Sequence, residues 1–390
     1  LAYRCIHIPS SMNEVQAAVR TLKYAEFLRF FTAIQLMRST DGIRIAKKPK
    51  IFSTKKIQQV IQSLSFEMTA DQRDTLEKIL YDMGSTHTMY RLVQGDVGCG
   101  KTVVATLSLY AAFLSGYQGA MLAPTEILAR QHYQSVNEVL APFGVKTEVL
   151  YSALSSSKKK EILEDVASGK IDILIGTHSM IQDSVSFHNL GLTIADEQQR
   201  FGVAQRKSLK QKGEQVDFLL MSATPIPRTL AASLFGDMDV STIETMPPGR
   251  ITPVTTLVKE NSFRTVLDDV KSLLVSGRQL YVICAAVDEN EEYHARNVYD
   301  TTESIQTVFP QYKVACLHGR MSTDEKQEIM QAFNTNDIQI LVSTTVVEVG
   351  VNVVNATGMI IYDADRFGLS QLHQLRGRIQ RGSEQGYCWL

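Results

Sequence analysis

One eight-residue segment, Gly95 to Thr102, restricts the fold of this chain more than any other feature. Its sequence, Gly-Asp-Val-Gly-Cys-Gly-Lys-Thr, fits the pattern GxxxxGK[ST]. In that pattern the glycines let successive backbone N–H groups point inward around a phosphate. An apolar stretch at 90–94 precedes the segment and a helical pattern follows it. A strand, this loop and a helix in that order predict an α/β fold with a parallel sheet.

Short apolar runs alternate with helical patterns along most of the chain, which favours parallel sheets covered by helices on both faces. The alternation is interrupted by a strong break at Met246-Pro247-Pro248-Gly249. We therefore predict two α/β domains, over 66–248 and 249–390. Residues 1–65 are predicted to form a helical linker with helices at 11–38 and 54–64.

The composition is that of a globular protein and excludes a largely disordered, collagenous or coiled-coil chain. The chain has 390 residues, of which 44% are hydrophobic, enough for two or three domains with cores. No run of about 18 apolar residues occurs, so we expect no membrane span. Five scattered cysteines predict reduced thiols in a cytoplasmic protein. Because the chain begins with Leu1 and ends on a predicted strand, we expect a fragment of a longer protein.

Charge is distributed unevenly. Residues 1–65 hold eleven Lys and Arg against three Asp and Glu, an excess of eight positive charges, although the whole chain carries −1. Such a basic arm on a mildly acidic body suggests a polyanion near the arm. The alternative is a solvated helical face without a partner.

The glycine-rich segment and two residues that follow a later strand carry the predicted chemistry. Lys101 would reach the β- and γ-phosphates of a nucleotide, and the Thr102 hydroxyl would hold Mg²⁺. Asp196 and Glu197 follow an apolar strand at 191–195; Asp196 would hold Mg²⁺ through water, and Glu197 would activate the attacking water. The candidate nucleotide-binding loop comprises Gly95, Asp96, Val97, Gly98, Cys99, Gly100, Lys101 and Thr102.

Two further clusters complete this site if the domains face each other. The triplet Ser222-Ala223-Thr224 follows an apolar strand and could bridge the γ-phosphate region to the second domain. In that domain the candidate catalytic residues are Gln374, Arg378 and Arg381; the two arginines lie one turn apart, and guanidinium groups bind phosphate oxygens well. Taken alone, the triplet could be a simple turn and the arginines could be ordinary surface residues.

Eight segments in order resemble the superfamily 2 helicases, and within them the RecG family of bacterial ATP-dependent DNA helicases. The resemblance covers 66–390 strongly and 1–65 moderately. The segments are Leu92–Gly98, Ala123–Ala129, Gly176–His178, Asp196–Gly202, Met221–Leu230, Leu317–Met321, Ser343–Gly350 and Arg366–Arg378.

The resemblance implies two RecA-like domains and roles for further residues. Adenine recognition would involve Phe66, Thr69 and Gln72, and the nucleotide would also contact Gly350 and Asn352. Coupling between nucleotide and DNA would involve Gln198, Ser222, Ala223 and Thr224. The implied DNA-binding residues are Pro124, Thr125, Glu126, Thr177, His178, His318, Gly319, Thr344 and Thr345.

The activity implied is ATP- and Mg²⁺-dependent movement along double-stranded DNA, used in branch migration and regression of stalled replication forks. The implied partners are branched DNA, such as forks and Holliday junctions, and single-stranded DNA-binding protein; we expect a monomer. Three alternatives stay open: a transcription-repair coupling factor-type translocase, a non-hydrolysing ATP-gated DNA-binding module, and an NTPase independent of DNA. Four positions depart from the family pattern: Gln199, Asn352, Val354 and Gln380. Two of them, Asn352 and Gln380, keep the second alternative open.

Overall fold

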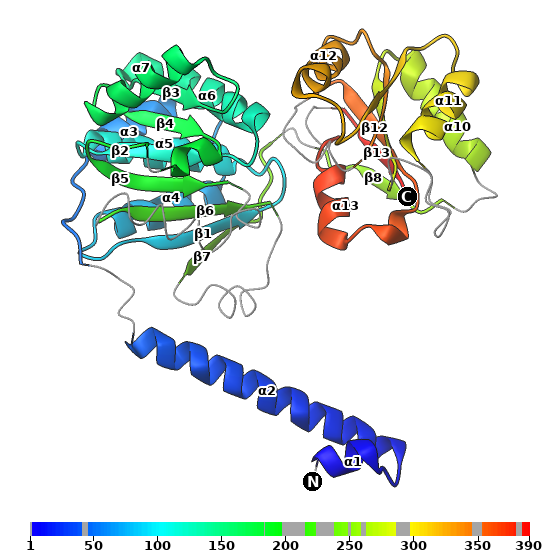
Figure 1. Ribbon diagram of the computed structural model, residues 1–390, viewed down its shortest axis with the longest axis horizontal. Coiled ribbons are helices and arrows are strands. Elements are labelled where there is room, and N and C mark those ends of the chain that lie inside the picture. The colour runs from blue at the N-terminus through cyan, green and yellow to red at the C-terminus, as the bar shows by residue number, and fades with distance from the viewer. Residues whose placement is uncertain are drawn as a thin grey trace.

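The computed structural model describes most of the chain. The described residues are 2–40, 46–182, 184–196, 215–223, 238–248, 251–258, 263–285, 297–344, 353–379 and 384–390. They form two parallel α/β lobes and an N-terminal helical arm (Figure 1). The predicted fold class is therefore confirmed.

The N-terminal arm contains α1 (Ala2–His7) and the long helix α2 (Met12–Thr40). α2 lies apart from both sheets in Figure 1 and exposes aromatic side chains, including Tyr24 and Phe27. The next helix, α3 (Thr54–Ser63), behaves differently: its Ile57 and Val60 are buried in the core of the first lobe. We expected α3 to belong to the linker, but its apolar face packs as part of the lobe.

The first lobe is built on a seven-stranded sheet in the order β3-β4-β2-β5-β6-β1-β7. All its strand pairs are parallel, so the carboxyl ends of the strands meet at one edge. The strands are β1 (Tyr90–Gly95), β2 (Gln118–Leu122), β3 (Thr147–Leu150), β4 (Ile173–Gly176), β5 (Leu190–Ala195), β6 (Asp217–Ser222) and β7 (Asp239–Ile243).

Two core clusters cover the two faces of this sheet, because side chains alternate along each strand. Val93 and Met221 join the cluster that contains apolar residues of α3, α4, α5 and α6, whereas Leu92 and Leu220 join the cluster beneath α7. The helices and short 3-10 turns of the lobe are α4 (Ala70–Met83), α5 (Lys101–Leu114), α6 (Glu126–Leu140), η1 (Ala141–Phe143), α7 (Ser156–Ala167) and η2 (His178–Ile181).

The second lobe has a six-stranded parallel sheet in the order β10-β11-β9-β12-β13-β8. One core cluster contains residues of α12 and α13, and the other contains residues of α10 and α11. The elements are β8 (Val254–Thr256), α10 (Phe263–Val275), β9 (Gln279–Ile283), α11 (Val298–Val308), β10 (Val314–Leu317), α12 (Thr323–Asn334), β11 (Ile340–Ser343), β12 (Ala356–Ile361), η6 (Ala364–Arg366), α13 (Leu369–Arg376) and β13 (Tyr387–Trp389).

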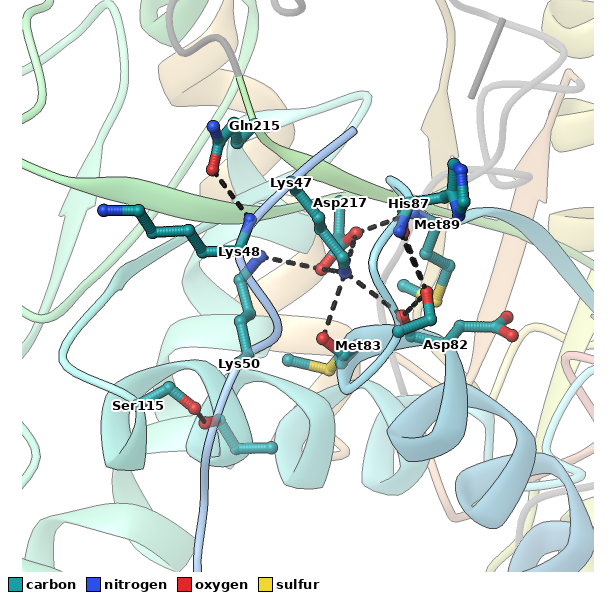
Figure 2. A network of polar contacts seen from close by, with 12 residues as sticks. Lys47, Lys48, Lys50, Asp82, Met83, His87, Met89, Ser115, Gln215 and Asp217 are labelled. Atoms are coloured by element: carbon teal, nitrogen blue, oxygen red, sulfur yellow. Dashed lines mark hydrogen bonds and ion pairs between the residues drawn. The ribbon is translucent and has the colours of Figure 1, made fainter. Parts of the chain in front are cut away.

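The segment before α3 is attached to the base of the first sheet by a buried charge cluster (Figure 2). The Nζ atoms of Lys47 and Lys50 lie 2.7 and 2.8 Å from the Oδ2 of Asp217, the first residue of β6. The other oxygen of Asp217 accepts a hydrogen bond from the backbone N–H of Met89 at 2.6 Å. Two of the charges that we assigned to a basic, polyanion-facing arm are therefore internal to the fold.

No helix in the described part of the chain combines the length and hydropathy needed to cross a bilayer.

Candidate functional site

The glycine-rich segment connects β1 to α5 at the carboxyl edge of the first sheet. Gly98 and Gly100 adopt φ values of 86° and 87°, in the left-handed region that favours glycine. Gly95 has no room for a side chain, because a Cβ there would lie 2.5 Å from the Cys99 Sγ and 2.6 Å from the Ile243 carbonyl oxygen. The backbone conformation of this loop thus depends on glycine at these positions.

Lys101 begins α5 and folds back over the loop. Its Nζ donates hydrogen bonds to the carbonyl oxygens of Gly95 at 2.7 Å and Asp96 at 3.0 Å. Both acceptors are neutral, and no carboxylate of the described residues forms an ion pair with this ammonium group. The amino end of α5 adds partial positive charge at the same place. The loop is therefore suited to an anionic ligand such as a phosphate.

Asp196 lies directly after β5, at the same edge of the sheet. Its backbone N–H donates to the Leu122 carbonyl oxygen at 2.9 Å, and its Oδ2 lies 2.8 Å from the Nε2 of His132. The carboxylate of Asp196 and the hydroxyl of Thr102 are oxygen donors of the kind that Mg²⁺ prefers. No cluster of three or more His, Cys, Asp or Glu able to hold a metal occurs among the described residues. This donor set fits Mg²⁺, which keeps several waters and needs only one or two protein ligands beside substrate phosphates.

The residues expected at the adenine lie before and within the start of α4. Phe66 is exposed. Thr69 caps α4, and Gln72 completes a capping box with it. The Gln72 amide is only 1% exposed: its Oε1 accepts from the Thr69 N–H at 2.9 Å, and its Nε2 donates to the Cys99 carbonyl oxygen at 2.7 Å. Gln72 therefore connects α4 to the glycine-rich loop, and its contact with adenine stays a prediction.

The second lobe contributes the end of α13. Gln374 and Arg378 are 6% and 5% exposed. Gly377, between them, touches the glycine-rich loop: a Cβ at Gly377 would lie 2.5 Å from the Cβ of Val97. The structure thus brings the end of α13 against the glycine-rich loop.

The expected DNA-contacting residues of the first lobe lie together. Thr125 caps α6 after β2, and Thr177 precedes η2 after β4. Since β2 and β4 are paired in parallel, both segments lie at the same edge of the sheet. His178 is exposed, whereas Pro124, Thr125, Glu126 and Thr177 are partly exposed.

The second lobe departs from expectation at two DNA-binding candidates. His318 is 4% exposed, and its Nε2 forms a hydrogen bond with the Tyr299 hydroxyl at 2.8 Å. Thr344 is 7% exposed. Neither side chain is presented at the surface in this structure, whereas Gly319 is exposed.

Several predicted residues lie outside the described part of the chain, so the structure does not place them. Ser222 and Ala223 are described, and Val354, one of the departures, is exposed. The predicted residues outside the described ranges are Glu197, Gln198, Gln199, Thr224, Thr345, Gly350, Asn352, Gln380 and Arg381.

Sequence reasoning missed two positions that the structure makes prominent, His132 and Asp217. His132 belongs to the buried face of α6 with Ala129, Val136 and Leu140, and this helical spacing was the available signal. Asp217 is a lone acidic residue at the start of an apolar strand, and nothing in the sequence indicates its two lysine partners.

Comparison with known proteins identifies the domains. Residues 60–233 match the family described as DEAD/DEAH box helicase, and residues 265–383 match the helicase conserved C-terminal domain. The ATP-dependent DNA helicases RecG of Bacillus subtilis (strain 168) and Streptococcus pneumoniae serotype 4 are each 47% identical to the chain over all its 390 residues. The chain spans 57% and 58% of their lengths, little more than half of each relative.

Comparison with solved structures also points to helicases. A structure of RecG bound to a three-way DNA junction matches the whole chain with 39% identity and a TM-score of 0.84, over 51% of that protein. Saccharomyces cerevisiae Dbp5 bound to RNA and ADP BeF3 matches 87% of the chain with a TM-score of 0.63; at 16% identity this likeness shows the fold alone. The resemblance drawn from the eight motifs is confirmed: over its whole length the chain is similar to the RecG DNA helicases.

Proposed function

We propose that the chain is the ATP-driven motor of a RecG-type DNA helicase. It binds ATP between the two lobes, hydrolyses it, and uses the change in lobe separation to move along double-stranded DNA. In the whole protein this movement drives branch migration and the regression of stalled forks. The supporting observation is the junction of the glycine-rich loop with the end of α13, where Val97 meets Gly377.

Each described residue of the site has a role in this proposal. The N–H groups of the loop surround the β-phosphate, and Lys101 leaves its carbonyl acceptors for the β- and γ-phosphate oxygens. Thr102 and Asp196 hold Mg²⁺, which neutralises phosphate charge when bound. Arg378 stabilises the charge of the transferring phosphoryl group from the second lobe. Glu197 and Arg381, which the structure does not describe, keep their proposed roles as base and second arginine.

Movement along DNA follows from the position of the DNA-contacting residues. Pro124, Thr125, Thr177 and His178 contact the DNA backbone from the edge of the sheet that also carries the nucleotide site. Contacts of this kind are mostly to phosphates, so binding depends on salt and not on sequence. A gap between lobes that closes on ATP and opens after hydrolysis changes the distance between two such surfaces.

The remaining expectations belong to the same proposal. The partners are branched duplex DNA and single-stranded DNA-binding protein, the protein acts as a monomer in the cytoplasm, and the domains divide near 65 and 248. The related RecG was solved bound to a three-way DNA junction, which supports branched DNA as the substrate class of this chain.

The decisive experiment measures phosphate release from ATP with and without branched duplex DNA, beside Lys101→Ala. We expect DNA to stimulate turnover and the substitution to abolish it. Nucleotide binding without turnover would instead favour an ATP-gated DNA-binding module, with Gln380→Gly as the next variant. Turnover indifferent to DNA would favour a DNA-independent NTPase, and direct binding of RNA polymerase would favour a coupling factor-type translocase.

A further inference from the structure

We propose that His132 is a positioning residue that orients Asp196, and that it thereby links the DNA-contacting end of α6 to the metal-binding part of the nucleotide site. The inference rests on the proposed function. It concerns a residue that none of the predicted motif roles includes.

His132 is held in place by its helix. It is 7% exposed and lies on the face of α6 that packs on the sheet, between Ala129 and Val136. Its Nε2 lies 2.8 Å from the Oδ2 of Asp196, whose side chain is itself only 15% exposed. An ionised carboxylate can only accept, so the Nε2 of His132 carries the proton of this hydrogen bond.

Asp196 is restrained twice by the same structural unit. Its backbone N–H donates to Leu122, the last residue of β2. Its side chain is bonded to His132 of α6, the helix that follows β2. One carboxylate oxygen is engaged by the histidine, and the carboxylate orientation is thereby limited. The unit formed by β2 and α6 therefore helps to fix both where Asp196 lies and how its carboxylate is turned.

The amino end of α6 is the end that contacts DNA in the proposed function. Thr125 caps the helix, and its hydroxyl accepts a hydrogen bond from the Leu128 N–H. The amino end of a helix favours an anion such as a DNA phosphate. His132 lies seven residues, or about 10 Å, further along the helix. Because a helix moves as a stiff rod, a displacement of its amino end on DNA is transmitted to the hydrogen bond at Asp196.

The competing explanation is that His132 only satisfies a buried polar group and supports the fold. It predicts a loss of stability without any change specific to the metal. Positioning predicts a selective loss of the tightening that Mg²⁺ gives to nucleotide binding, because a misoriented Asp196 carboxylate holds the water of the Mg²⁺ less well. For comparison, partners that orient a direct metal ligand account for about 10–100-fold in metal affinity.

The test compares four proteins: wild type, His132→Leu, His132→Gln and His188→Leu. Leucine removes the hydrogen bond, and glutamine keeps a donor at about the Nε2 position. His188 is an exposed histidine of the same lobe and provides the matched control. Binding of fluorescent ADP is titrated with Mg²⁺ and with EDTA, and unfolding in urea is measured in parallel.

We expect His132→Leu to lose at least about ten-fold of the Mg²⁺-dependent tightening, with affinity in EDTA unchanged. His132→Gln should recover most of it, and His188→Leu should match wild type. In phosphate-release assays the stimulation by DNA should fall in His132→Leu more than the basal rate. If the leucine variant does not fold, His132→Asn, which is polar but shorter, takes its place in every comparison.

The two proposals fail in different ways. Mg²⁺-dependent tightening that is the same in wild type and in the leucine or asparagine variant overturns the role of His132 and leaves the proposed function standing. A wild-type protein that binds no nucleotide overturns the proposed function, and this inference with it.

Discussion

The two ends of β1 and β6 hold lysine side chains in opposite circumstances. At the amino edge of the sheet, Lys47 and Lys50 both contact Asp217, and the three side chains are at most 1% exposed. At the carboxyl edge, Lys101 contacts the carbonyl oxygens of Gly95 and Asp96. The same residue type is therefore neutralised by a carboxylate at one end and held by neutral acceptors at the other.

This difference assigns the lysines of the amino edge to the stability of the fold and Lys101 to ligand binding. A buried lysine needs an opposite charge, because the low dielectric of the interior penalises an unpaired ion. Lys101 lies at a partly buried position, where an incoming phosphate can replace its carbonyl acceptors. Substitutions at the amino edge should therefore change the free energy of unfolding, and substitutions at the carboxyl edge should change ligand binding.

The largest effect is expected from Asp217→Asn. It leaves two buried lysines without a carboxylate, so the free energy of unfolding should fall by about 3–5 kcal/mol, measured by urea denaturation. Asp74→Asn is the matched control, because its ion pair with Lys78 is exposed and contributes at most about 0.5 kcal/mol. A loss at Asp217 no larger than that of the control would contradict the structural role of the cluster.

Replacing all three residues of the cluster by apolar ones tests whether the loss in Asp217→Asn comes from unpaired buried charges. In Asp217→Leu combined with Lys47→Met and Lys50→Met, no buried charge is left unpaired, so much of the stability lost in Asp217→Asn should return. The return should be incomplete, because the Met89 N–H then lacks its acceptor. A triple variant less stable than Asp217→Asn would show that the ion pairs themselves stabilise the fold.

Lys101→Met should impair turnover and nucleotide binding much more than the stability of the fold. Turnover should fall by about 10²–10³-fold, as when a preorganised group that stabilises transition-state charge is removed. The rise in unfolding temperature that ATP causes should disappear, while the free energy of unfolding without nucleotide changes by no more than about 1–2 kcal/mol. Lys78→Met, at an exposed position, is the control. Unchanged thermal stabilisation by ATP in Lys101→Met would contradict the assigned site.

Gln72→Leu should have an intermediate effect, lowering both the free energy of unfolding and the affinity for nucleotide. It removes the acceptor of the Thr69 N–H and the donor to the Cys99 carbonyl oxygen, each a partly or fully buried group. The free energy of unfolding should fall by about 1–3 kcal/mol, and nucleotide affinity should fall with it because the loop loses its link to α4. Gln134→Leu, on the exposed face of α6, is the control. Loss of stability with full nucleotide affinity would show that the link does not order the loop.

The smallest effect concerns alkaline pH. Burial lowers the pKa of Lys47 below its ordinary value of 10.5, against the opposing effect of Asp217. Between the lowered pKa and 10.5 the unfolded chain binds more protons than the folded one, so this residue makes the free energy of unfolding rise with pH. Wild type should therefore gain stability relative to Lys47→Met as pH rises toward 10.5, measured by urea denaturation at several pH values.

That comparison must be made as a difference between the two proteins. Burial raises the pKa of the Tyr110 hydroxyl, and it raises the pKa of the Cys388 thiol to about 12. Both groups make wild type and variant less stable at high pH, and their contribution cancels in the difference. A difference that shrinks as pH rises would contradict the lowered pKa of Lys47.

Much of the candidate nucleotide site could be predicted from the sequence, because it is built from contiguous segments. The positive φ values of Gly98 and Gly100 and the position of Lys101 at the start of a helix follow from eight consecutive residues. The motifs also predicted that Asp196 belongs to this site, and that the end of α13 does so if the two lobes face each other; the structure brings Gly377 against Val97. His318 was assigned to DNA from its motif, but the burial of its ring against Tyr299 depends on how α11 packs and has no local signal.

The sequence by itself determined the two parallel α/β lobes, the glycine-rich loop and the likeness to RecG helicases, since strand–helix alternation and loop conformation depend on neighbouring residues. Only the tertiary structure decided which charged groups face inward. Lys47 and Asp217 are 170 positions apart in the chain, and His132 and Asp196 are 64 apart. Burial makes these contacts energetically important, and burial is a property of the packed sheet and helices that no single segment contains.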